Sequence, residues 1–327
     1  MIVSLRDDAD AAAVKRELAA RGLWIAAVER GLGGSGVHYV VAAHSSAADP
    51  SEIAKIAGVS SVSMPAPEHP RMDRQGPQVN VNGVNIGGGR PVLMCGPCSV
   101  ESAEQIDAIA RRLAPLGVRF LRGGAFKPRS SPYTFQGHGD TALKWMRDAA
   151  DRHDLRVVTE VLSEHDVPLV AEHGDLLQIG SRNMQNFALL KRVGRTGKPV
   201  LLKRAMSATI DEWLLAGEYL LHHGASGVVL CERGIRGFDT TTRNLLDLGA
   251  VALLSTVHKL PIIVDPSHGT GRRDLILPLS RAALAAGAAG VMIETHDNPG
   301  HALSDGPQAL DADEMTGVVQ ALLGVAP

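Results

Sequence analysis

The sequence lacks long apolar runs, and this absence limits where the protein can act. No stretch reaches the roughly 18 consecutive apolar residues that span a bilayer. The first ten residues, MIVSLRDDAD, also lack the basic region, apolar region and cleavage site of a secretory signal. We therefore expect a cytoplasmic protein with no membrane partner.

The sequence also lacks an excess of charge and has few cysteines. A formal net charge of -2 and a pI near 6.7 exclude a general nucleic-acid-binding surface, so any anion binding must be local. Three cysteines are an odd number, which argues against a disulfide framework and leaves room for a metal thiolate. At 327 residues, the chain is long enough for one large domain and a small one.

Residues 1–65 alternate short strand and helix patterns and predict a small ferredoxin-like (ACT-like) α+β domain in β-α-β-β-α-β order. This domain serves either regulation by a small ligand or oligomerisation. Residues 66–77 are rich in proline and charge, which is typical of a linker. The expected strands are Ile2–Leu5, Ile25–Arg30, His38–Ala43 and Val59–Met64, and the expected helices are Asp10–Arg21 and Pro50–Ala57.

The alternation of strand and helix patterns in residues 78–327 predicts a (β/α)8 barrel with an N-terminal β-hairpin cap. Gln78–Gly89 alternates apolar and polar residues around Asn82-Gly83, a strong hairpin signal, and we expect it to cap the bottom of the barrel. Helix patterns lie between most of the strands; one begins with Ser102 and Gln105 spaced as a capping box. A doubly wound open sheet is the main alternative. Eight apolar runs recur, at Val92–Cys95, Phe120–Leu121, Arg156–Val161, Leu176–Ile179, Pro199–Leu202, Gly227–Leu230, Pro261–Val264 and Gly290–Ile293.

Polar residues with strong chemistry follow nearly every expected strand. Enzymes with this architecture carry their chemistry on the loops after the strands, so this distribution indicates an active site. In chain order these residues are Cys98 after strand 1, Arg122, Lys127 and Arg129 after strand 2, Arg182 after strand 4, Lys203 at strand 5, Arg233 at strand 6, His268 after strand 7, and Glu294 and Asp305 at and after strand 8.

Closure of the barrel brings strand 8 beside strand 1 and places Cys98, His268, Glu294 and Asp305 in one sector. A thiolate, an imidazole and two carboxylates suit one borderline divalent ion such as Mn, Fe, Zn or Co. His296 and Asp297 remain alternatives to Glu294. The cations of the other strands lie across the mouth, where they predict a pocket for a small, phosphorylated ligand.

The same residues resemble the 3-deoxy-D-arabino-heptulosonate 7-phosphate (DAHP) synthases, in the form that carries a small N-terminal regulatory domain. The resemblance spans essentially the whole chain. It rests on six ordered motifs: GPCSVES at Gly96, KPRSSPYTFQG at Lys127, GSRNMQNF at Gly180, CERGIRGF at Cys231, DPSHGTG at Asp265, and ETH with SDGPQ between Glu294 and Gln308.

The resemblance implies a metal-dependent, aldol-like condensation of phosphoenolpyruvate with D-erythrose 4-phosphate. It also implies an aromatic amino acid effector and a homotetramer. The candidate catalytic residues are Lys127, Cys98 and His268, and we expect Lys127 to be the proton donor because it lies on the loop between the two expected phosphate sites. The implied metal ligands are Cys98, His268, Glu294 and Asp305. The implied substrate contacts are Arg122, Lys127, Arg182, Lys203 and Arg233 for phosphoenolpyruvate and Arg129 and Ser130 for the phosphate of erythrose 4-phosphate.

Two rival functions remain. 3-Deoxy-D-manno-octulosonate 8-phosphate synthase uses a similar barrel with arabinose 5-phosphate, but the KPRSS segment resembles the erythrose 4-phosphate loop. A catalytically silent phosphate-ligand sensor has no need for a metal-bound thiolate. A separate hypothesis concerns Cys95, which forms CGPC with Cys98: the two could form a reversible regulatory disulfide.

Overall fold

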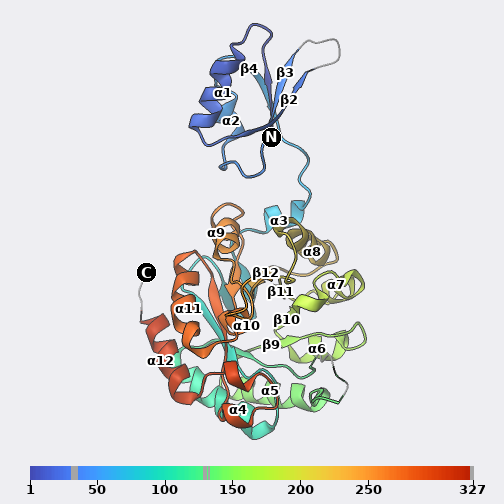
Figure 1. Cartoon of the computed structure of the whole chain (residues 1–327). Helices are drawn as coiled ribbons and strands as arrows, with labels where there is room; N and C mark the ends of the chain where they lie inside the picture. The colour runs from blue at the N-terminus through green and yellow to red at the C-terminus, as the bar shows by residue number, and fades with distance from the viewer. Residues whose placement is uncertain (31–35, 128–130, 132, 325–327) are drawn as a thin grey trace. The chain divides into compact units, whose positions relative to one another are not determined.

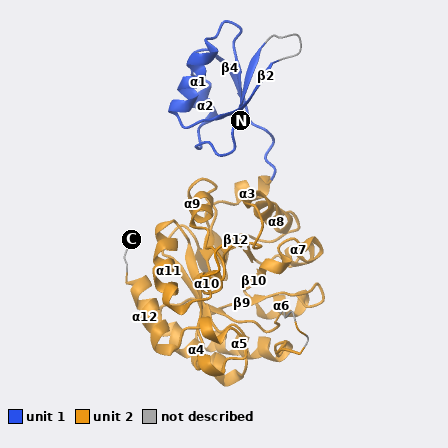
Figure 2. Ribbon diagram, viewed as in Figure 1, with its two compact units in different colours: residues 1–68 blue, residues 69–327 orange. Residues whose placement is uncertain are grey.

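Two units make up the chain in the computed structural model, Met1–Glu68 and His69–Pro327 (Figures 1 and 2). The structure describes residues 1–30, 36–127, 131 and 133–324. Within these residues, no helix is both long enough and apolar enough to cross a membrane.

The first unit is a four-stranded antiparallel sheet in the order β2-β3-β1-β4, packed against two helices. Val14 and Leu18 of the first helix share a buried core with Val3 and Leu5 of the first strand. This order fits the expected ferredoxin-like pattern. The elements are β1 (Ile2–Leu5), α1 (Ala11–Ala20), β2 (Ile25–Arg30), β3 (Val37–Val41), α2 (Pro50–Ile53) and β4 (Val59–Ser63).

The segment expected to be a linker contains a helix, α3 (Pro70–Gln75), so the structure corrects that prediction. Met72 of α3 is fully buried and lies against Gly217 of helix α8 (Ile210–His222). The Glu218 carboxylate accepts a hydrogen bond from the Met72 backbone N–H at 3.0 Å. These contacts tie α3 to the second unit, which begins at His69.

The predicted hairpin is present as β5 (Val79–Val81) and β6 (Val84–Ile86). Its turn residues Asn82 and Gly83 have φ angles of 47° and 86°, as a tight hairpin of this type requires. Its buried side chains share one apolar cluster with inward-facing barrel residues, among them Met94, Phe120 and Met292. The hairpin therefore closes one end of the barrel, as expected.

Eight parallel strands close into a barrel in the order β10-β11-β12-β13-β14-β7-β8-β9, which confirms the (β/α)8 prediction over the open sheet. The strands are β7 (Val92–Gly96), β8 (Phe120–Arg122), β9 (Arg156–Glu160), β10 (Leu176–Ile179), β11 (Val200–Lys203), β12 (Val228–Glu232), β13 (Ile262–Val264) and β14 (Gly290–Glu294). The remaining α-helices are α4 (Ala103–Leu113), α5 (Asp140–Arg152), α6 (Val167–His173), α7 (Phe187–Gly194), α9 (Leu248–Thr256), α10 (Pro266–Thr270), α11 (Ile276–Ala285) and α12 (Ala312–Leu323).

The capping box predicted at the start of α4 forms only in part. The Ser102 hydroxyl accepts a hydrogen bond from the Gln105 backbone N–H at 3.1 Å. The Gln105 side chain does not return to Ser102: its oxygen accepts from the Glu101 backbone N–H at 2.9 Å, and its nitrogen lies 2.9 Å from His296 Nε2. Gln105 therefore links α4 to the segment after β14.

Candidate functional site

Four side chains that can bind a metal converge at the carboxyl ends of the strands. Ligand atoms of Cys98, His268, Glu294 and Asp305 all lie within 4.8 Å of one another. Pairing of β14 with β7 brings Glu294 opposite Gly96, two residues before Cys98. These are the four residues that the sequence predicted as a group.

The chemistry of this donor set fits a divalent cation. Burial, with the nearby Glu294 carboxylate, raises the pKa of the Cys98 thiol to about 12. A thiolate at this position at neutral pH therefore needs additional positive charge, which a bound cation provides. Burial alone would raise the pKa of Glu294, but the charges of His268 and Arg122 outweigh it and lower that pKa to about 2. Glu294 is thus an ionised carboxylate ready to bind a cation.

Asp265 orients the His268 ring. One oxygen of this buried carboxylate accepts from the His268 backbone N–H at 3.0 Å, and the other lies 2.8 Å from His268 Nδ1. The ring consequently presents Nε2 to the cluster, 3.2 Å from a Glu294 oxygen. Carboxylates commonly hold metal-binding histidines in this way. Sequence reasoning missed Asp265, although it directly follows β13.

The structure distinguishes Glu294 from the alternatives His296 and Asp297. Among the residues described, the cluster includes Glu294 and neither alternative. His296 is buried, its Nε2 contacts Gln105, and its Nδ1 accepts from the Asn298 backbone N–H at 2.9 Å. These contacts leave His296 engaged in a separate hydrogen-bond network.

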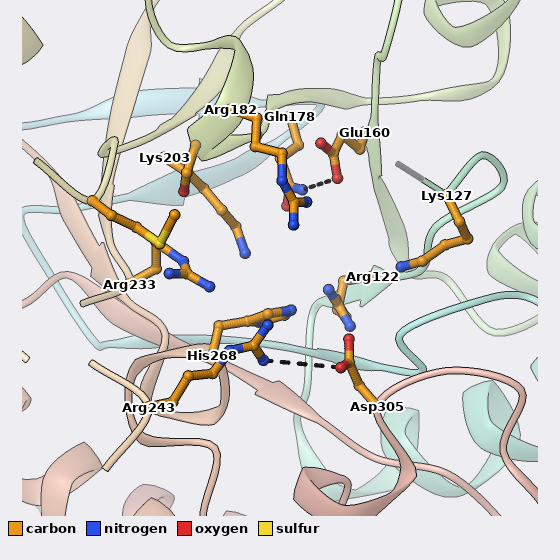
Figure 3. A pocket seen from close by; sticks show the side chains of 13 residues that line it. Arg122, Lys127, Glu160, Gln178, Arg182, Lys203, Arg233, Arg243, His268 and Asp305 are labelled. Atoms are coloured by element: carbon orange, nitrogen blue, oxygen red, sulfur yellow. Dashed lines mark hydrogen bonds and ion pairs between the residues drawn. The ribbon is translucent and has the colours of Figure 1, made fainter. Parts of the chain in front are cut away.

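A pocket of about 240 Å³ adjoins the four donors and is lined by cationic side chains. Figure 3 shows these side chains pointing from different strands and loops into a common space. The acids of the lining are Glu160 and Asp305. Five of the six cations were predicted from the sequence, and Arg243 is an addition. The six are Arg122, Lys127, Arg182, Lys203, Arg233 and Arg243.

Among the described residues, buried carboxylates accept hydrogen bonds from two of these cations. Arg122 donates to a Glu294 oxygen at 2.8 Å, and Lys203 donates to Asp265 at 2.6 Å. Arg233 differs, because its Nη1 is buried and has no hydrogen-bond partner among the described residues. Burial lowers the pKa of Arg233. An anion oxygen in the pocket would supply the missing partner.

Lys127 lies at the border between the pocket and the four donors. Its Nζ is 2.9 Å from both the carbonyl oxygen and the Sγ of Cys98. The neighbouring residues Arg129 and Ser130, which were predicted to hold a phosphate, lie outside the described residues.

Besides Arg243, two further polar residues of the pocket, Glu160 and Gln178, were not named from the sequence. Glu160 ends β9, and its carboxylate accepts from the Gln178 side-chain nitrogen at 3.2 Å (Figure 3). Its position at a strand end was the available signal. Gln178 was harder to find, because it lies within the expected β10 rather than after it.

Cys95 and Cys98 occupy different environments. Cys95 belongs to the buried cluster between the barrel and its helices, where burial raises its pKa. Cys98 lies among the donors at the mouth of the barrel, and both thiols are free. A disulfide between them would therefore require the end of β7 to move.

Two proteins of known family are similar to this chain. The chain is 51% identical over 248 residues to a phospho-2-dehydro-3-deoxyheptonate aldolase of Thermotoga maritima. The aligned region covers 76% of this chain and 73% of the relative. A 2-dehydro-3-deoxyphosphooctonate aldolase of Methylibium petroleiphilum is 32% identical over 274 residues, covering 74% of this chain and 93% of the relative.

Solved structures give the same result. The crystal structure of the Thermotoga maritima DAHP synthase matches with a TM-score of 0.76 at 41% identity, covering 98% of this chain and 95% of that one. A truncated form from the same organism has a TM-score of 0.70 at 47% identity, covering 76% and 90%. The model of the DAHP synthetase I family matches residues 68–323. The chain therefore belongs to the DAHP synthetase I family.

Proposed function

We infer that this chain is an enzyme with DAHP synthase activity, which joins phosphoenolpyruvate, erythrose 4-phosphate and water to give DAHP and phosphate. This reaction opens the shikimate pathway to chorismate and the aromatic amino acids. One observation carries the inference: in a member of this family, a four-donor cation site adjoins a pocket lined by six cationic side chains.

The cations bind and orient the two phosphorylated substrates. Arg122, Lys127, Arg182, Lys203 and Arg233 would hold the phosphate and carboxylate of phosphoenolpyruvate, and Arg129 and Ser130 the phosphate of erythrose 4-phosphate. The unpartnered nitrogen of Arg233 supports this assignment. Two anionic substrates repel each other, so a shared ring of positive charge both offsets the repulsion and fixes the angle of attack.

One divalent ion (Mn, Fe, Zn or Co) would be held by Cys98, His268, Glu294 and Asp305. When bound, such an ion supplies Lewis acidity that makes an aldehyde carbon easier to attack. Asp265 keeps His268 Nε2 directed at this position.

The bond changes assign a role to Lys127. C3 of phosphoenolpyruvate forms a bond with the aldehyde carbon, a water oxygen bonds to C2, and the bond between C2 and the phosphate oxygen breaks, which leaves C2 as a ketone carbon. Of the two protons that the water loses, one leaves with the phosphate and the other balances the proton gained by the aldehyde oxygen. The aldehyde oxygen becomes a hydroxyl and needs a proton. Lys127 Nζ, which lies beside the donors and on the edge of the pocket, would supply it.

Phosphate release tests the activity against its rivals. We expect release with phosphoenolpyruvate plus erythrose 4-phosphate, none with arabinose 5-phosphate, and none with either sugar after treatment with a chelator. Release with arabinose 5-phosphate alone would identify an octulosonate synthase. No release with either aldehyde, in the presence of Mn²⁺, would favour a silent phosphate-ligand sensor.

We further propose that residues 1–65 regulate the enzyme through an aromatic amino acid and that the chain assembles as a homotetramer. The sheet-and-helix unit formed by Met1–Glu68 supports a separate regulatory module. Turnover of the full chain with added tyrosine or phenylalanine tests the effector, and its mass in solution tests the assembly.

A further inference from the structure

Two side chains that contact the donor cluster, Gln308 and Arg243, have no individual contact assigned to them in the function proposed above. Gln308 lies in the 3-10 helix η5 (Gly306–Gln308) and is only 4% exposed. Its nitrogen Nε2 donates to Glu294 Oε2, and its oxygen Oε1 accepts from Arg243 Nη1 at 3.0 Å. Gln308 therefore connects Arg243 to a carboxylate of the donor cluster.

The chemistry of this chain allows only one orientation of the Gln308 amide. A guanidinium can only donate hydrogen bonds, and an ionised carboxylate can only accept them. Gln308 must then turn its oxygen to Arg243 and its nitrogen to Glu294. With Oε2 of Glu294 occupied in this way, Oε1 faces His268, 3.2 Å from its Nε2.

Arg243 is itself well anchored. Its backbone N–H donates to the Thr270 carbonyl oxygen at 2.9 Å, which ties the loop after β12 to the end of α10. Its Nη1 also lies 3.9 Å from an Asp305 oxygen (Figure 3). One guanidinium thus reaches Asp305 directly and Glu294 through Gln308.

We propose that Arg243 and Gln308 are positioning residues that hold Glu294 and Asp305 in the orientation in which they bind the divalent cation. The proposal rests on the cation site of the proposed function. Residues that hydrogen-bond to ligands typically change metal affinity by about 10- to 100-fold when they are removed.

The direction in which cation affinity changes when Arg243 is removed distinguishes a positioning role from a purely electrostatic one. A positive charge beside a cation site repels the cation, so a purely electrostatic role means that removing Arg243 tightens cation binding. Positioning predicts the opposite, because without Arg243 the Gln308 amide can rotate and release Glu294.

The test measures the dissociation constant for Mn²⁺ alone, from the electron paramagnetic resonance signal of free Mn²⁺. We expect Gln308→Met to raise this constant about ten-fold or more, and Arg243→Met to raise it as well. The control is Arg236→Met, which removes an exposed cation from the same loop and should leave the constant unchanged.

The double variant tests whether Arg243 acts through Gln308. We expect the dissociation constant of the double variant for Mn²⁺ to lie within about two-fold of that of Gln308→Met alone. Gln308→Met already breaks the connection from Arg243 to Glu294, so removing Arg243 as well has little further effect. Unchanged or tighter Mn²⁺ binding by Arg243→Met would overturn the proposal. The Arg243 side chain is 43% exposed, so this variant gives an answer even if Gln308→Met does not fold.

These measurements use no substrate. If the unaltered chain binds Mn²⁺ but fails to condense the two substrates, the proposed function fails and the positioning role stands. If both variants bind Mn²⁺ like the unaltered chain, the positioning role fails whatever the activity.

Discussion

Lys127 shows how one residue can serve both parts of the site. Its ammonium group donates to the Cys98 carbonyl oxygen and approaches the Cys98 sulfur, each at 2.9 Å, and it also lines the pocket. A proton donor must lie close to the atom that receives the proton. This position between the donors and the pocket meets that requirement.

Replacing Lys127 should harm turnover more than substrate binding. We expect Lys127→Met to lower kcat by about 100-fold or more, because a positioned acid contributes about this factor, while KM changes only a few-fold. Steady-state kinetics with both substrates measure the two constants. Lys144→Met, which removes an exposed lysine paired with Asp140, is the control. Near-normal turnover of Lys127→Met would contradict the assigned role.

Replacing Arg233 should weaken phosphoenolpyruvate binding without destabilising the fold. Without ligand, the buried and unpartnered Nη1 lowers the stability of the folded chain. When a charged ligand is bound, each hydrogen bond to it contributes about 1.5–3 kcal/mol to the free energy of binding. We therefore expect Arg233→Met to weaken phosphoenolpyruvate binding about ten-fold or more without lowering the melting temperature. Calorimetric titration and a thermal melt measure the two effects. A lower melting temperature with unchanged binding would mean that Arg233 is structural.

Strand-end position made many of the site residues predictable. Cys98, His268 and Glu294 follow or end apolar runs, and the strands of a closed parallel barrel all end at one face. Arg243 and Gln308 escaped prediction, because they lie well beyond the strand ends in long loops. Their roles come from side-chain contacts between loops that are distant in sequence, and a single sequence carries no signal for such contacts.

At the scale of elements, the hairpin β5–β6 acts as a plug. Val81 and Ile86 are fully buried and pack on the inward-facing residues of the barrel. A barrel needs such filling, because its interior is a packed core rather than a pore.

Shortening a plug residue should therefore destabilise the second unit. We expect Ile86→Ala to lower its free energy of unfolding by about 2–5 kcal/mol, the usual cost of such a cavity, and Ile86→Val by less. Denaturant unfolding followed by circular dichroism measures the change. The exposed neighbour provides the control, Asn85→Ala. Equal stability of Ile86→Ala and Asn85→Ala would contradict the role of the plug.

Elements were predictable where periodicity was strong. All eight barrel strands lie within one or two residues of their expected positions, because short apolar runs between amphipathic helices leave little ambiguity. Helix α3 was missed because the prolines before it and the charges within it resemble a linker. Only the contact of Met72 with α8 reveals it, and that contact joins segments about 145 residues apart.

For the molecule as a whole, the donor cluster should couple cation binding to stability. A ligand that binds only the folded state at 100 times its dissociation constant stabilises it by about 2.7 kcal/mol. We expect Mn²⁺ to raise the melting temperature of the second unit, and Asp305→Asn to remove most of this shift. Differential scanning calorimetry measures it. An equal shift in Asp305→Asn would place the stabilising ion elsewhere.

The seam between β7 and β14 has a consequence for how the enzyme is made. Cys98 emerges early from the ribosome, but Asp305 is synthesised 207 residues later. Strand β14, the last of the barrel, must pair with β7, the first, before the four donors can lie close together. A nascent chain therefore cannot assemble the four donors until Asp305 has left the ribosome, and a truncated product that ends before Asp305 lacks one of them.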